Sequence, residues 1–155
     1  KEDWTKETIV LSLTLSQWGI LNAKKKHCAY YQVSRPQKSL VLQVNLGGEH
    51  DSFFYTYFKK KKDRAYFSHH LHAGHARKIS LGWIRIDLNL DDGEALIEEL
   101  QTDWMKAVFE MHKALNSNVH SHYLVEHKPY ASKVYVDYML KRYKKWDEML
   151  LSAAV

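Results

Sequence analysis

The chain has 155 residues, of which 45% are hydrophobic and 26% are charged, with a formal net charge of +5. This length and composition predict one globular domain and exclude a disordered or two-domain chain. No apolar run is long enough to span a membrane, and the charged start KEDW lacks the apolar block of a cleavable signal. The lone cysteine, Cys28, excludes a disulfide scaffold within the chain. Because the chain does not begin with Met, we expect a piece of a longer protein.

The first predicted elements are strands. The first half of residues 8–18 alternates apolar and hydroxyl residues, and residues 39–46 are aliphatic and β-branched, which is typical of strands. Residues 51–62 are rich in aromatic residues and are predicted to pair with the second strand across the GGEHD loop. Residues 65–71 are predicted to continue the same sheet.

Residues 78–90 are predicted to form a long strand with Ile84 and Ile86 on one face, and the stretch that follows has two interpretations. One is a helix, because apolar residues recur every three or four positions at Ile97, Leu100, Trp104, Val108, Met111 and Leu115. The other is a hairpin that turns at Asp92-Gly93, with a helix that begins near Asp103 as its cap. Periodicity alone leaves both open.

Residues 132–155 show the clearest helical pattern. Their apolar and aromatic stripe predicts core packing rather than a cofactor site. The basic side of this helix is formed by Lys141, Arg142, Lys144 and Lys145.

An acidic wall is the first candidate site. If residues 94–101 are a strand, Glu99, Gln101 and Asp103 share a face, while Glu98 points with Leu100 to the other side. Converging carboxyl groups act as acids or bases, or hold a divalent metal. On an exposed helix face, the same residues would only be solvated.

Histidines form the second candidate site, a metal site at His70, His72 and His75 in the sequence HHLHAGH. His70 and His72 would share a face of a strand, but further ligands lie far away in sequence. A second group, His120, His122 and His127, adds to this hypothesis. The alternative is a set of surface or substrate-facing histidines, and no HExxH or paired CxxC motif is present.

Lysine clusters interleaved with aromatic residues are the third signal. The run FFYTYFKKKKDRAYF combines cations with rings, as platforms for single-stranded nucleic acid do. No nucleophile elbow, glycine-rich nucleotide loop, or RNA-binding or zinc-finger signature accompanies it. The candidate residues for binding nucleic acid or a phosphorylated ligand are Lys59, Lys60, Lys61, Lys62, Lys141 and Arg142. The alternative is a sheet with an aromatic core and solvated lysines.

The run GWIRIDLNLDDGEALIEELQTDW resembles a segment of the large polyvalent proteins of phages and mobile elements. In that family, a strand, a glycine turn and a strand that ends in "EEIQSDW" precede a helix. The matching positions here are Ile84, Arg85, Gly93 and residues 98–104, with Leu for Ile and Thr for Ser. Residues 140–142 resemble an "LKR" pattern that lies downstream in the family. The resemblance covers about half of the chain.

The resemblance implies that residues 94–101 are a strand that ends at a site, and that the chain acts in the cytoplasm of a bacterial host or phage-infected cell. The segment MKAVFEMHKALNS lacks the family's glycine, which disfavours an acetyltransferase. We therefore expect a single α+β domain, with a mostly antiparallel sheet and two main helices packed on it. As its function, we expect an accessory domain that binds nucleic acid or another polyanion through its lysines.

The alternative function is an enzyme, a hydrolase or transferase, with a cleft formed by Glu99, Gln101, Asp103 and Arg85. In that hypothesis, His72 and His75 join the cleft, and a divalent metal is an optional cofactor.

Overall fold

The computed structural model describes residues 10–16, 39–68, 80–117 and 122–155. Four strands form one antiparallel sheet in the order β1-β2-β3-β4. Their bounds are Val10–Ser16 (β1), Ser39–Asn45 (β2), Ser80–Asn89 (β3) and Glu94–Gln101 (β4). The fold is thus α+β with an antiparallel sheet, as the sequence predicted.

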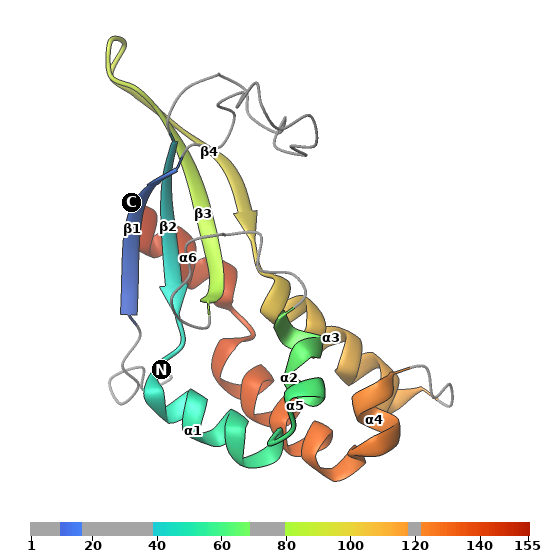
Figure 1. The fold of residues 1–155 in the computed structure, drawn as a ribbon. Helices are drawn as coiled ribbons and strands as arrows, with labels where there is room; N and C mark the ends of the chain where they lie inside the picture. The colour runs from blue at the N-terminus through green and yellow to red at the C-terminus, as the bar shows by residue number, and fades with distance from the viewer. Residues whose placement is uncertain (1–9, 17–38, 69–79, 118–121) are drawn as a thin grey trace, which may run out of the picture.

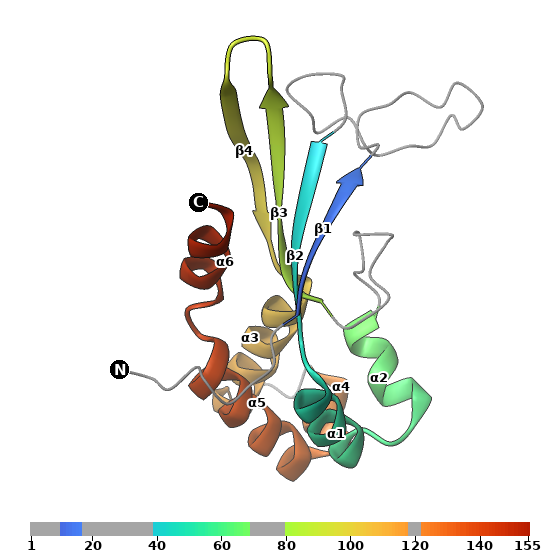
Figure 2. The ribbon, with the colours of Figure 1, turned by 90° about the vertical axis from the view of Figure 1, so that its left-hand side faces the viewer.

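The helices gather mainly at one end of the sheet, as Figure 1 shows. They are α1 (Gly48–Tyr57), α2 (Lys61–Ser68), α3 (Asp103–Asn116), α4 (Tyr123–His127), α5 (Pro129–Tyr143) and α6 (Trp146–Ala154). Helix α3 corresponds to the first predicted helix, whereas the helix predicted over residues 132–155 is divided at residues 144–145 into α5 and α6. The last helix α6 instead runs back along one face of the sheet (Figure 2). None of the described helices is long and apolar enough to cross a membrane.

Two predicted strands are helices. The sheet was expected to include residues 51–62 and 65–71, but these positions fall largely in α1 and α2. Residues 69–71 lie outside the described residues. The physical reason is the spacing of His50, Phe54 and Phe58, which are buried and lie four residues apart. This spacing puts all three on one side of a helix, so core packing overrides the β preference of the aromatic residues.

The hairpin interpretation of residues 78–101 is confirmed. Strands β3 and β4 pair through a turn at which Gly93 has φ +69°, a conformation that glycine adopts without strain. Helix α3 begins directly after β4. Its cap is Thr102 rather than the predicted Asp103, because the Thr102 hydroxyl accepts a hydrogen bond from the Met105 backbone N–H at 3.0 Å.

The core contains a chain of polar contacts that joins three helices. Trp104 Nε1 on α3 donates to Tyr135 Oη on α5 at 2.7 Å, and Tyr135 Oη lies 2.9 Å from His50 Nε2 on α1. The direction of the Tyr135–His50 hydrogen bond depends on the tautomer of His50: the hydroxyl donates if the imidazole proton is on Nδ1. His50 Nδ1 then faces the Asp51 carboxylate at 3.3 Å. Burial keeps the pKa of Tyr135 well above its ordinary value, so the hydroxyl stays neutral.

Gly82 sets the spacing between the sheet and α6. A Cβ at this position would lie 2.8 Å from the Gln101 carbonyl oxygen and 2.9 Å from Leu150 Cδ1 of α6. We expect Gly82→Ala to lower the free energy of unfolding by about 1–3 kcal/mol, because the backbone of β4 must shift to relieve the contact. Urea denaturation measures this, and Gly48→Ala, where a Cβ meets nothing within 4 Å, is the control. An unchanged midpoint in Gly82→Ala would show that this contact relaxes freely.

Candidate functional site

The sheet has one apolar and one polar face. Leu42, Val44 and Ile84 lie on the apolar face, which α6 covers, since Leu150 reaches Gly82 there. We call the opposite side the polar face. Its described members on β2, β3 and β4 are Ser39, Val41, Gln43, Asn45, Trp83, Arg85, Asp87, Asn89, Glu94, Leu96, Glu99 and Gln101.

The polar face is nevertheless buried at its centre, although Leu96 towards the β3–β4 turn is 44% exposed. Gln43, Arg85 and Asp87 are each 2% exposed. Buried polar groups are costly unless they are hydrogen-bonded or charge-paired, so a sheet face with this composition indicates a site rather than a core.

Arg85 holds two carboxylates at the middle of the polar face. Its Nε lies 3.3 Å from Glu99 Oε2, and its Nη1 lies 3.6 Å from Glu98 Oε2. The side chains of Arg85 and Glu98 are 3% and 4% exposed, and that of Glu99 is 16% exposed. This triad is therefore largely shielded from water, where charge pairing is strong and the loss of one partner is costly.

A β-bulge explains why both glutamates reach Arg85. The register pairs Arg85 with Glu99 and Ile86 with Ile97, so Glu98 is an extra residue in β4. The sequence predicted Glu98 on the opposite side with Leu100, and this was wrong. Simple alternation of side chains fails at a bulge, because two residues of one strand oppose one residue of its partner.

Gln101 and Asp103 form a second pair where β4 meets α3. Gln101 Nε2 donates to Asp103 Oδ1 at 3.1 Å. The other oxygen, Asp103 Oδ2, is buried, and no described residue gives it a hydrogen bond. One oxygen of this carboxylate is therefore held in place while the other remains an unused acceptor. Gln101 also lines an open hollow of about 440 Å³ between β4, α3 and α6, with Phe109 and Trp146 on its wall.

Further buried polar atoms of the same face have no hydrogen-bond partner among the described residues. They are Ser39 Oγ, Gln43 Nε2 and Trp83 Nε1, from residues that are 2–3% exposed. Each such atom costs about 1–3 kcal/mol when it is left unpaired in the folded protein. A cluster of them on one face is typical of a place where a ligand or ordered water completes the hydrogen bonds.

The charge of the polar face favours a particular kind of ligand. The guanidinium of Arg85 faces the carboxylates of Glu98 and Glu99, and the carboxyl groups of Asp87 and Asp103 lie on the same face or at its end. Carboxylates thus outnumber cations among the described residues of this face. An anionic ligand would be repelled, whereas a ligand with hydrogen-bond donors or a positive charge would be attracted.

The structure brings the four predicted cleft residues into one region. Arg85 and Glu99 are in contact, Gln101 and Asp103 are in contact, and Gln101 lies next in line on the face of β4 that carries Glu99. Glu98, Gln43 and Trp83 are further neighbours of these residues that the sequence did not predict. Alternation in SLVLQVNL and GWIRID could have placed Gln43 and Trp83 on the side of Arg85, but alternation could not have placed Glu98.

The predicted metal ligands His70, His72 and His75 lie outside the described residues, as does His120. His122 is 6% exposed with its ring 4.2 Å from that of Tyr66, and burial lowers its pKa. His127 stacks on Tyr123 at the surface. Within the described ranges, no group of three or more His, Cys, Asp or Glu side chains is arranged to hold a metal ion.

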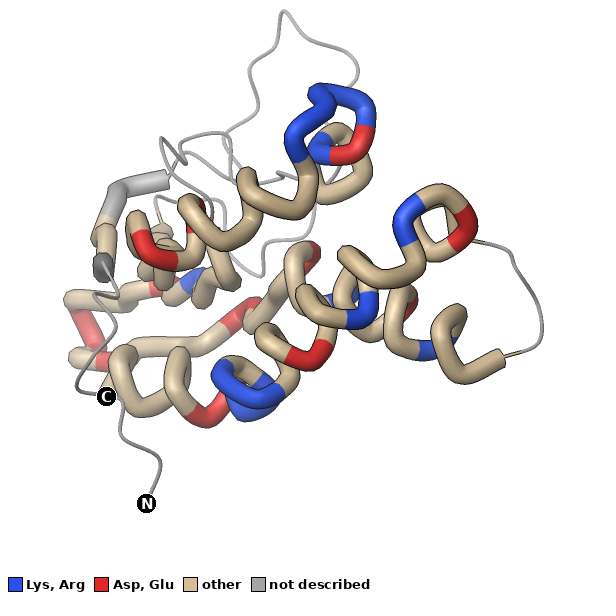
Figure 3. Tube along the Cα trace, turned by 90° about the horizontal axis from the view of Figure 1, so that it is seen from below, with Lys and Arg blue, Asp and Glu red and all other residues tan. Residues whose placement is uncertain are grey.

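The predicted basic residues fall into two separate regions. Residues 59–62 form the connection from α1 into α2, whereas Lys141 and Arg142 lie near the end of α5. Seen from below, the two basic stretches lie apart (Figure 3). Arg142 is partly neutralised, since its Nη2 lies 3.9 Å from Glu49 Oε1 and its guanidinium 4.9 Å from the Tyr138 ring. The six residues thus do not form one surface.

Comparison of the chain with protein-family models, with curated proteins and with solved structures gave no match. The resemblance of residues 82–104 to polyvalent proteins therefore stays a prediction.

Proposed function

We propose that the polar face of the sheet is the site of an enzyme that binds a small polar substrate and moves a proton on it through Asp103. The observation that carries this proposal is the state of the Asp103 carboxyl group. One oxygen accepts a hydrogen bond from Gln101, and the other is buried without a partner among the described residues. A carboxylate oriented in this way is suited to accept a proton from a bound hydroxyl, amine or water.

The remaining residues have supporting roles in this proposal. Arg85 fixes Glu98 and Glu99, which supply acceptors and negative potential to a substrate with donor groups. Gln43 and Trp83 supply the free N–H donors of the face, which would orient an oxygen of the same substrate. Proton transfer to a positioned carboxylate is the step that hydrolases and group transferases use to activate water or an acceptor hydroxyl.

The resemblance to polyvalent proteins supports the same location. The residues that match the family's "EEIQSDW" pattern include Glu99, Gln101 and Asp103, which gather where β4 meets α3. This agreement also supports a role in the cytoplasm of a bacterial host or a phage-infected cell.

A thermal-shift screen tests the proposal. The probes are small amines, guanidines, sugars and nucleosides, together with Mg²⁺ and Mn²⁺ as separate arms, because carboxylates also bind divalent cations. A ligand at 100 times its Kd stabilises the folded state by about 2.7 kcal/mol, which raises Tm by several degrees in a domain of this size. We expect at least one donor-rich organic probe to do so.

The variant Asp103→Asn separates a site residue from a structural one. The new amide oxygen can still accept from Gln101, so we expect unfolding of the ligand-free protein to change by no more than about 1 kcal/mol. Binding of the stabilising probe should weaken at least tenfold. The control is Asp137→Asn, an exposed carboxylate paired with Lys133 on α5, which should bind as the parent does. The proposal fails if Asp103→Asn and the parent bind every probe equally.

A further inference from the structure

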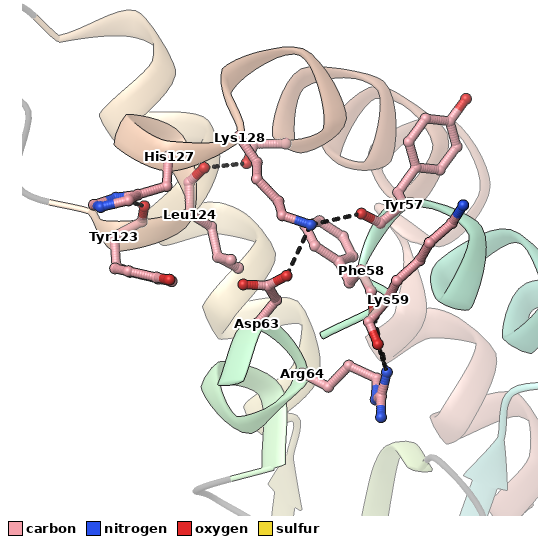
Figure 4. A network of polar contacts seen from close by, with 10 residues as sticks. Tyr57, Phe58, Lys59, Asp63, Arg64, Tyr123, Leu124, His127 and Lys128 are labelled. Atoms are coloured by element: carbon pink, nitrogen blue, oxygen red, sulfur yellow. Dashed lines mark hydrogen bonds and ion pairs between the residues drawn. The ribbon is translucent and has the colours of Figure 1, made fainter. Parts of the chain in front are cut away.

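The connection between α1 and α2 is held in place from both sides. Lys128 Nζ, at the start of α5, donates to the Tyr57 carbonyl oxygen at 3.2 Å and pairs with the buried Asp63 carboxylate at 2.8 Å (Figure 4). Arg64 Nη1 donates to the Phe58 carbonyl oxygen at 3.2 Å and to that of Lys59. The free carbonyl groups at the end of α1 are therefore bound by cations from α2 and α5.

These hydrogen bonds fix the backbone of the turn, and the lysine side chains of the turn are exposed to solvent. Lys59, Lys60, Lys61 and Lys62 are all exposed. In the described part of the chain, no carboxylate pairs with Lys59, Lys60 or Lys61, and the nearby Asp63 is already bound to Lys128. Neighbouring like charges repel one another, so a bound anion would relieve this repulsion.

Aromatic rings stand beside these cations. The rings of Tyr123 and His127 on α4 stack with centroids 4.4 Å apart and planes inclined by 28°. Lys62 Nζ lies 5.4 Å from the centre of the Tyr123 ring, and hydrogen bonding to Tyr123 raises the pKa of Lys62, so this lysine stays charged. Tyr123 is half-buried and His127 is exposed, so the stack reaches the surface. We call Lys59, Lys60, Lys61, Lys62, Tyr123 and His127 the α1–α2 corner.

The other basic region differs in the partners of its cations and in the exposure of its rings. Lys145 pairs with Glu148 at 3.1 Å, and Arg142 is engaged by Glu49 and Tyr138. Lys141 and Lys144 are exposed, but the ring stack of this region, Phe53 with Tyr138, is half-buried, whereas the stack of the α1–α2 corner includes the exposed His127. The α1–α2 corner is also formed by elements separate from the polar face, which prefers the opposite charge.

We propose that the α1–α2 corner binds single-stranded nucleic acid. The lysines contact successive phosphates, and a base stacks on the Tyr123–His127 pair. A single strand fits because its bases offer free ring faces, whereas the bases of a duplex are already stacked on one another. The corner is a turn between two short helices, so it offers neither a recognition helix nor a β-ribbon for a groove of duplex DNA. The lysines give affinity without sequence readout.

Fluorescence anisotropy with labelled oligothymidylate tests the lysines. We compare the parent with a triple variant, Lys59→Gln, Lys60→Gln and Lys61→Gln, over a range of salt concentrations. For single strands, the slope of log binding constant against log salt concentration is about −0.7 per neutralised phosphate. The triple variant should therefore have a slope that is shallower by about 2, and it should bind at least tenfold more weakly at low salt. The matched control removes the same charge elsewhere, with Lys141→Gln, Lys144→Gln and Lys145→Gln, and should stay within about threefold of the parent.

The variant Tyr123→Leu tests the ring stack. Base stacking on an aromatic ring contributes roughly fivefold or more in affinity per base, so Tyr123→Leu should weaken binding by that factor and leave the salt slope nearly unchanged. Circular dichroism confirms that each variant folds. The proposal is overturned if the parent does not bind at low salt, if duplex DNA binds as well as the single strand, or if both triple variants weaken binding equally. It is also overturned if Tyr123→Leu has no effect while inorganic polyphosphate competes as well as oligothymidylate, because the ligand is then a generic polyanion.

Discussion

Arg85→Met is expected to lower the free energy of unfolding by about 3–5 kcal/mol, one of the two largest effects that we predict for a single substitution. The guanidinium is 3% exposed and is the cation that Glu98 and Glu99 face. Without the guanidinium, the carboxylates of Glu98 and Glu99 lie close together in a largely buried environment. Two desolvated charges of the same sign are strongly unfavourable. Chemical denaturation followed by circular dichroism measures the loss.

A triple variant provides the control for this prediction. Arg85→Met combined with Glu98→Gln and Glu99→Gln removes all three charges and should regain most of the lost stability, because the neutral amides are far less costly to bury than carboxylates. Full non-additivity of this kind is the signature of one coupled cluster. If the triple variant instead loses as much free energy of unfolding as the sum of the single substitutions, Arg85 stabilises the sheet by packing rather than by charge.

Tyr135→Phe is expected to lower the free energy of unfolding by about 2–4 kcal/mol, although it removes only one oxygen. That oxygen accepts from Trp104 and contacts His50, so its loss removes the acceptor of Trp104 Nε1 and one contact of His50 Nε2 in the core. The three residues come from α3, α5 and α1, so the change also loosens the contact among these helices. Urea denaturation and loss of near-UV aromatic signal would report it.

The matched control is Tyr130→Phe, in the same helix but 74% exposed. It should change the free energy of unfolding by less than about 0.5 kcal/mol. Equal and small effects of the two variants would mean that the Trp104–Tyr135–His50 contacts contribute nothing net to stability.

The sequence was most informative where a local signal agreed with the tertiary fold. The Asp92-Gly93 turn, the alternation of residues 84–90 and the resemblance to polyvalent proteins together predicted β3, β4 and the start of α3, and the structure confirms these elements. The same signals predicted that Arg85, Glu99, Gln101 and Asp103 lie together, and the structure shows them so. Their chemical role remains a proposal.

The sequence misled where residue preference was used without spacing. The aromatic residues of DSFFYTYF favour strands, yet Phe54 and Phe58 are buried on one side of α1. The bulge at Glu98 could not be predicted either, because it depends on how β4 registers against Arg85 and Ile86. The chain of contacts from Trp104 to His50 joins residues far apart in sequence, so no local pattern indicated it.

The central claim is that the polar face of the sheet receives a ligand, and the indole N–H of Trp83 reports on it most directly. This group is buried, and among the described residues it has no hydrogen-bond acceptor. In a ¹H–¹⁵N spectrum, its resonance can be assigned by its loss in Trp83→Phe. On addition of a small amine or guanidine that raises Tm, we predict that this resonance and the Gln43 side-chain amide shift in the parent, and that neither shifts in Asp103→Asn. Ligand-induced shifts confined to other parts of the chain would contradict the assignment of the polar face as the site.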